Sequence, residues 1–239
     1  MKHSLRLFGA SFYFSLLDLL RVPINFLIVT FAPAIILYAT GSLESDSNTL
    51  PVLAAYSTFG VMNSCVMQVA AMVSQDRGLP WEAYLRSLPG SWTARLWGKA
   101  CATTVTSYLS VIPVFAIVVL DRGFTALSSS WMVLPATLMI VPLSVSFGII
   151  LGFIGPPRLT ATVASLVFIT LALIGRMFGG DIEGWRAYLP TGLARQFVSL
   201  VSKQFHLPWP ETLTLGIETL IFMVCGAFLI NKLGNRSTT

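Results

Sequence analysis

The sequence predicts an all-α integral membrane protein with six transmembrane helices, and three observations lead to that fold class. Hydrophobic residues make up 55% of the 239 residues and charged residues only 10%, against about 25% charged residues in a soluble domain. A helix needs about 20 apolar residues to cross a hydrocarbon core of about 30 Å. Four long stretches contain no charged residue, at 22–43, 47–75, 100–120 and 123–157, and two shorter apolar stretches follow at 159–175 and 212–231.

The N-terminal segment predicts a helix of a different kind. Leu5, Phe8, Phe12 and Leu16 recur at helical spacing among polar residues, which is typical of an amphipathic helix. We therefore expect an interfacial helix at 3–20, lying along the membrane surface before the first span. The expected spans cover residues 22–40, 51–74, 98–120, 131–154, 159–178 and 211–231. These elements form a single transmembrane domain over residues 1–239.

The distribution of Lys and Arg predicts the orientation, because short cytoplasmic loops carry the excess of these residues. With six spans, both termini lie on one side of the membrane. That side holds ten of the 15 Lys and Arg residues. Both termini and the loop at 75–97 are therefore expected in the cytoplasm. The net charge of +5 is interpreted as this orientation signal and not as a sign of nucleic-acid binding.

The segment at 190–205, before the last span, carries an apolar stripe. Leu193, Phe197 and Val201 alternate with Arg195 and Lys203 at helical spacing. We expect this helix to lie on, or dip into, the outer leaflet.

The loop at 74–100 is unusual for a linker between two spans. Leu79, Glu82, Leu85, Arg86 and Leu88 suit a short amphipathic helix. Such a helix, attached at both ends to a span, is suited to a mechanical contact with a cytoplasmic partner. An interfacial helix with snorkelling arginines would give the same pattern.

This loop resembles the loop between the second and third spans of ABC-2-type transporter permeases. The resemblance rests on charged residues followed by Gly78, Glu82, Leu85 and the pair Leu88-Pro89, with Gly98-Lys99 entering the next span. It extends over most of the chain, through the order of the spans and the stretch YLPTGLARQF at 188–197. Members of that family often carry glutamates where this chain has Gln75-Asp76.

The resemblance implies the permease subunit of an ATP-binding-cassette transporter in the cell inner membrane. It further implies export, a homodimer or heterodimer of permease subunits, and a separate cytoplasmic ATPase that docks on a coupling helix. The coupling residues would be Asp76, Arg77, Gly78, Glu82, Leu85, Arg86, Leu88 and Pro89. A phosphate-binding loop would require G-x-x-x-x-G-K-[ST], whereas Gly98-Lys99 is followed by Ala100. ATP would therefore bind the partner, and this chain would bind no cofactor and catalyse no reaction.

Polar residues within the spans suggest other sites. Glu218 lies about two turns inside the last span, and an acid there indicates a functional site by default. It could pair with Arg176 at the outer end of the fifth span, bind a cationic substrate, carry protons, or lie in a small polar cavity. Asn25, Asn63 and Gln68 are expected to form hydrogen bonds between helices.

Gly148 and Gly152 form a small-xxx-small pair within the fourth span, which permits close approach of two helices. The pair could form a dimer face, or it could pack within one subunit.

Two other function classes stay open as alternatives. A membrane-embedded enzyme is disfavoured, because His3 and His206 are the only histidines, both lie outside the spans, and no H-E-x-x-H motif is present. A proton-coupled secondary carrier would need several acids in its spans, whereas Glu218 stands alone there. The sequence does not identify the substrate.

Overall fold

The chain folds into a bundle of helices, and within the described residues it contains no strand. The computed structural model describes residues 2–21, 23–40, 49–78, 92–125, 130–154, 159–178, 184–204 and 209–234. The first half comprises α1 (Lys2–Arg21), α2 (Pro23–Ala39), α4 (Thr49–Gly78), α6 (Trp92–Tyr108) and α7 (Val111–Arg122). The second half comprises α9 (Val133–Met139), α10 (Val141–Ile154), α11 (Thr160–Ile174), the short 3₁₀ helix η1 (Gly184–Tyr188), α12 (Pro190–Gln204) and α13 (Trp209–Gly234).

Four helical segments are long and apolar enough to cross a membrane. They are Thr49–Arg77, Ala94–Arg122, Val133–Ile154 and Trp209–Phe228. They match four of the six expected spans, so the all-helical class and four helices of membrane-spanning length and composition are confirmed among the described residues. The expected spans at 22–40 and 159–178 fall on shorter apolar helices, Thr30–Ala39 and Thr160–Ile174.

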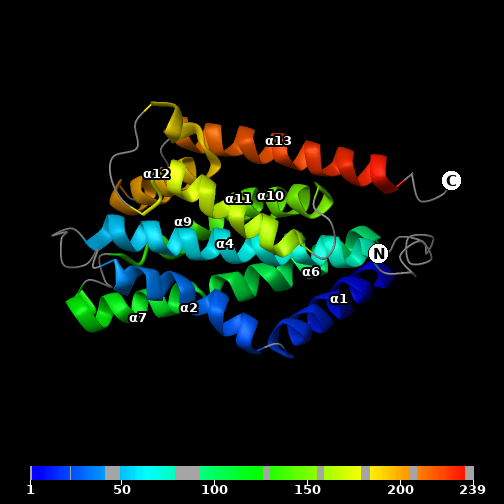
Figure 1. Ribbon diagram of the computed structural model, residues 1–239, viewed down its shortest axis with the longest axis horizontal. Helices are drawn as coiled ribbons and strands as arrows, with labels where there is room; N and C mark the ends of the chain where they lie inside the picture. Colours follow the sequence, from blue (N-terminus) through cyan, green and yellow to red (C-terminus); the bar gives the residue numbers. More distant parts are fainter. Residues whose placement is uncertain are drawn as a thin grey trace.

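Helix α4 forms the centre of the bundle and α13 its edge. In the most apolar window of α4, 83% of the residues are buried within the protein, against 11% for α13. Figure 1 shows α4 running through the middle, with α13 along one side; α1 begins and α13 ends at the same end of the bundle. An exposed stripe on α13, including Leu213, Ile217, Leu220 and Val224, suits contact with lipid chains.

Two of the membrane-length segments are interrupted near a proline. Between α6 and α7, the Ile112 N–H bonds to the Leu109 carbonyl at 3.2 Å, because Pro113 has no N–H to offer that carbonyl. Between α9 and α10, Pro142 likewise has no N–H to donate to the Leu138 carbonyl. Regular helical bonding resumes just after it, where the Ser144 N–H and hydroxyl both donate to the Ile140 carbonyl, at 3.2 and 3.0 Å.

The N-terminal helix packs closely on α6. A Cβ added at Gly98 would lie 2.7 Å from the Phe8 carbonyl oxygen, so only glycine permits this approach of α1 to α6. The helix predicted at 3–20 is present as α1, and Phe8 and Phe12 are partly covered while Leu5 is 74% exposed.

Helix α12 is part of the bundle. Its predicted apolar stripe is confirmed, but Leu193, Phe197 and Val201 are buried because α12 packs against α4, α9 and α13. The stripe is therefore covered by other helices, while the position of α12 on or in the outer leaflet stays a prediction. Other helices and lipid chains can both cover an apolar helix face, so an apolar stripe in the sequence does not show which of them will cover it.

Candidate functional site

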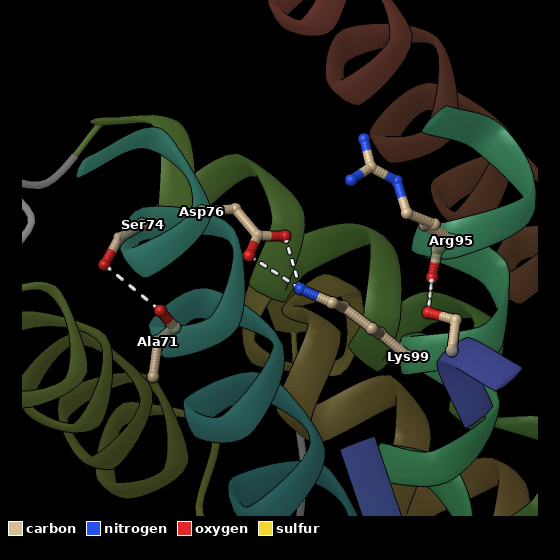
Figure 2. Close-up of polar contacts among 6 residues, drawn as sticks. Ala71, Ser74, Asp76, Arg95 and Lys99 are labelled. Atoms are coloured by element: carbon tan, nitrogen blue, oxygen red, sulfur yellow. Dashed lines mark hydrogen bonds and ion pairs between the residues drawn. The ribbon is translucent and has the colours of Figure 1, made fainter. Parts of the chain in front are cut away.

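The candidate site lies where α4 ends and α6 begins, on either side of the predicted coupling loop. Asp76 of α4 and Lys99 of α6 form an ion pair, with the Lys99 Nζ atom 2.6 and 2.7 Å from the two carboxylate oxygens of Asp76. About a quarter of each side chain is exposed. Figure 2 shows the two side chains extending toward each other between the helices. The pair therefore fixes the spacing of the two helix ends that carry the loop.

Arg77, the next residue, reaches the end of α10. Its Nη1 atom donates to the carbonyls of Gly152 at 2.9 Å and Phe153 at 2.6 Å, and its guanidinium lies 5.5 Å from the centre of the Phe153 ring. The last four carbonyls of a helix have no partner within it, and that end carries a partial negative charge. Arg77 therefore donates hydrogen bonds to carbonyls at the end of α10 and places a positive charge beside its partial negative charge. It also connects the end of α10 to α4.

Helix α1 joins the same region through α6. The Ser11 hydroxyl donates to the Arg95 carbonyl at 3.0 Å, and Figure 2 shows Arg95 on the first turns of α6, close to Lys99. Four helices, α1, α4, α6 and α10, thus meet where the loop is attached. We call Ser11, Asp76, Arg77, Arg95 and Lys99 the loop-end cluster.

The predicted coupling residues divide into two groups. Asp76 and Arg77 both form contacts within the chain, and Gly78 is the last residue of α4. The other predicted coupling residues, Glu82, Leu85, Arg86, Leu88 and Pro89, lie outside the described residues.

Sequence reasoning missed Lys99 as the partner of Asp76. The opposite charges of Asp76 and Lys99, on either side of one interhelical loop, could have indicated that the two residues pair. The pairing also depends on how far each helix extends past the other, which a single sequence does not specify.

Arg176 and Glu218, the second predicted site, are not brought together as an ion pair. Among the residues that the structure describes, Glu218 has no ion-pair partner, and its buried Oε2 atom has no hydrogen-bond partner. Arg176 follows α11 with a φ of 51°, and its carbonyl accepts a hydrogen bond from Arg195 of α12. Its backbone is thus held by α12.

The polar residues of the second span behave differently from one another. Gln68 accepts a hydrogen bond from the Thr106 hydroxyl of α6 at 2.7 Å, so its predicted role between helices is confirmed. The Oδ1 atom of Asn63 is buried and has no hydrogen-bond partner in the described part of the chain. The side chain of Asn25 lies outside the described part.

Gly148 and Gly152 pack within the subunit. A Cβ at Gly148 would lie 2.9 Å from the Cβ of Val69, and one at Gly152 would lie 2.7 Å from the Cβ of Val73. Of the two readings of this glycine pair, the structure supports packing of α10 on α4.

Comparison with protein-family models, with curated proteins and with solved structures finds no match to this chain. The functional interpretation therefore rests on the residues and their geometry.

Proposed function

We propose that this chain is the permease subunit of an ATP-binding-cassette exporter. It works as a dimer, in the cell inner membrane, with a separate ATPase subunit docked on the loop between α4 and α6. The observation that carries the proposal is the loop-end cluster. A loop that transmits force needs ends that cannot move independently, and the Asp76–Lys99 pair joins them at 2.6 Å.

The cluster also supports transmission beyond the loop. Because Arg77 binds the carbonyls at the end of α10 and Ser11 binds α6, displacement of the loop reaches four helices at once. A solvated linker has no need of such attachments. In this proposal Asp76 and Arg77 position the loop, while Glu82, Leu85 and Arg86 contact the ATPase.

The finer topology belongs to the same proposal. Helices α2 and α11 complete six spans, α1 lies in the cytoplasmic interface, and both termini are cytoplasmic. The Lys and Arg distribution supports this orientation. The meeting of α1 with the first turns of α6 is consistent with it, because it places α1 beside the end of a span.

The experiment reconstitutes the chain with its ATPase and compares Leu85→Asp with the unmodified complex. A charge placed in a packed interface should weaken ATPase binding tenfold to a hundredfold, that is by about 1–3 kcal/mol. Transport and ATPase stimulation should fall together. Tyr188→Asp is a matched control, because Tyr188 is 68% exposed and lies on η1, away from the loop-end cluster.

Two outcomes would contradict the proposal. Normal ATPase binding and transport by Leu85→Asp would show that the loop is not the docking site. Transport driven by a proton gradient without any ATPase, and lost in Glu218→Gln, would favour a proton-coupled carrier. The unpartnered Oε2 atom of Glu218 is the observation in favour of that second function.

A further inference from the structure

A band of small polar residues runs between α4 and the α6–α7 pair. On α4, the residues Ser57, Gly60, Ser64 and Gln68 are spaced three or four apart, which places them on one face of the helix. On the other side, the buried residues are Thr103, Thr106, Ser107 and Ser110. We call these eight residues the polar seam.

Two contacts fix how the two sides of the polar seam face each other. The Gln68 side chain accepts from the Thr106 hydroxyl at 2.7 Å. A Cβ at Gly60 would lie 2.9 Å from the Ser110 Oγ atom. The chain runs in opposite directions on the two sides. Ser64, midway between Gly60 and Gln68, therefore lies level with the residues between Thr106 and Ser110.

The hydroxyls of Ser64 and Ser107, at this level, and of Ser57, about two turns nearer the start of α4, are buried. Ser57, Ser64 and Ser107 are at most 1% exposed, and within the described residues their Oγ atoms have no hydrogen-bond partner. The one neighbour that the Ser107 hydroxyl has among these residues is the Cys65 thiol, which is only a weak hydrogen-bonding group. Buried polar atoms are nearly always paired, with protein or with water. The orphaned hydroxyls therefore indicate a further species that occupies the polar seam.

Ser64 and Ser107 lie near the middle of their membrane-length segments. Ser64 lies 15 residues after Thr49 and 14 before Gly78, in the middle of α4. Ser107 lies just before the interruption between α6 and α7 at residues 109–110. Interrupted helices with polar groups at mid-membrane depth are where transporters commonly bind their cargo or ions. Residues 57–68 and 100–120 carry no charge, which favours a neutral ligand over an ion.

We propose that the polar seam is a hydrated pathway at the middle of the membrane. It takes up water and neutral, hydrogen-bonding groups of a cargo, with Ser64 and Ser107 as its central ligands. The proposal does not depend on the ATPase partner, since the orphaned hydroxyls belong to this chain alone.

The test measures the reaction of single thiols with a cationic, membrane-impermeant methanethiosulfonate reagent. Cys65, Cys101 and Cys225 are first replaced by Ala in the full chain, which is then reconstituted in lipid vesicles without any ATPase. Ser64→Cys and Ser107→Cys exchange a single oxygen for sulfur, so the fold should persist. Val69→Cys is the matched control, because Val69 is also fully buried and near the same depth but packs on Gly148 of α10.

Both serine-derived thiols should react at least tenfold faster than the thiol at position 69. Rates that differ by less than tenfold, whether all fast or all slow, would overturn the proposal. Labelling after unfolding in detergent verifies that each thiol is present and reduced. If Ser107→Cys fails to reach the membrane, Ser64→Cys alone is compared with Val69→Cys by the same tenfold criterion. Because no ATPase is present, failure here leaves the permease proposal standing, and failure of Leu85→Asp leaves this one standing.

Discussion

Helix α4 presents two unlike faces to its neighbours. Toward α10 it places Val69 and Val73 over Gly148 and Gly152, with would-be Cβ contacts of 2.7–2.9 Å. Toward α6 and α7 it presents the polar seam, held by the bond from Thr106 to Gln68. Both faces bring helices close together, the first by shape alone and the second by a hydrogen bond together with a close approach at Gly60.

The difference matters because lipid chains are as apolar as valine, so no hydrophobic force draws helices together inside a membrane. Shape complementarity between valines and glycines leaves one tight arrangement. Hydroxyls can exchange partners with backbone carbonyls or water at small cost. We therefore infer that α4 and α10 move as one unit, and that rearrangement occurs at the polar seam.

The strongest test of the shape-based face is Gly152→Val. The new side chain would meet the Cβ of Val73 at 2.7 Å and the Ala70 carbonyl at 3.0 Å. We expect a loss of about 2–3 kcal/mol in stability, the upper part of the range for overpacking. Thermal unfolding in lipid nanodiscs measures it. Gly216→Val is the control, since nothing lies within 4 Å of a Cβ at Gly216; equal losses in both variants would contradict tight packing of α4 on α10.

An intermediate effect is expected at the loop-end cluster. Asp76→Ala leaves the Lys99 ammonium partly buried without its partner. The cost should be about 1–2 kcal/mol, between the values for exposed pairs and for broken buried pairs. The exchange Asp76→Lys with Lys99→Asp should recover most of the loss. Thermal unfolding of the single and double variants forms the cycle, and additive losses would show that the two charges do not interact.

The smallest effect is expected in the polar seam. Gln68→Leu removes the acceptor of the Thr106 hydroxyl, which keeps bonds to the carbonyls of Thr103 and Ala102. A hydrogen bond between transmembrane helices is worth about 0.6 kcal/mol on average, and we expect a loss near that value. A double-mutant cycle with Thr106→Val isolates the pair. A coupling energy above about 2 kcal/mol would mean that the polar seam is as rigid as the glycine face.

Much of the fold could be predicted from the sequence. Charge-free stretches of sufficient length predict spans because the cost of burying charge in lipid is a local property. The helix predicted at 3–20 follows from periodicity in the same way. Pairings between helices are harder, because they depend on the register and the facing sides of two helices. For this reason the sequence indicated the glycine pair but not its partners on α4, Val69 and Val73.

The predicted site illustrates the same limit. The sequence drew attention to Asp76 and Arg77 because they stand beside an unusual loop. It could not indicate that Asp76 meets Lys99 or that Arg77 reaches the carbonyls of Gly152 and Phe153. An interaction with the last carbonyls of another helix has no sequence pattern of its own. Likewise, the sequence showed the polar residues of α4, but it did not predict that they lie opposite Ser107.

The central position of α4 has a consequence for how the chain enters the membrane. Its mean hydropathy of 1.3 is the lowest of the four membrane-length segments, against 2.3 for Val133–Ile154, yet it is the most buried. During synthesis α4 emerges before α6 and α10, so its serines and Gln68 face lipid, or the insertion machinery, until those helices arrive. Biogenesis therefore depends on later helices to retain an earlier one. A ribosome stalled before α6 is complete would leave the core of the bundle as its least securely inserted part.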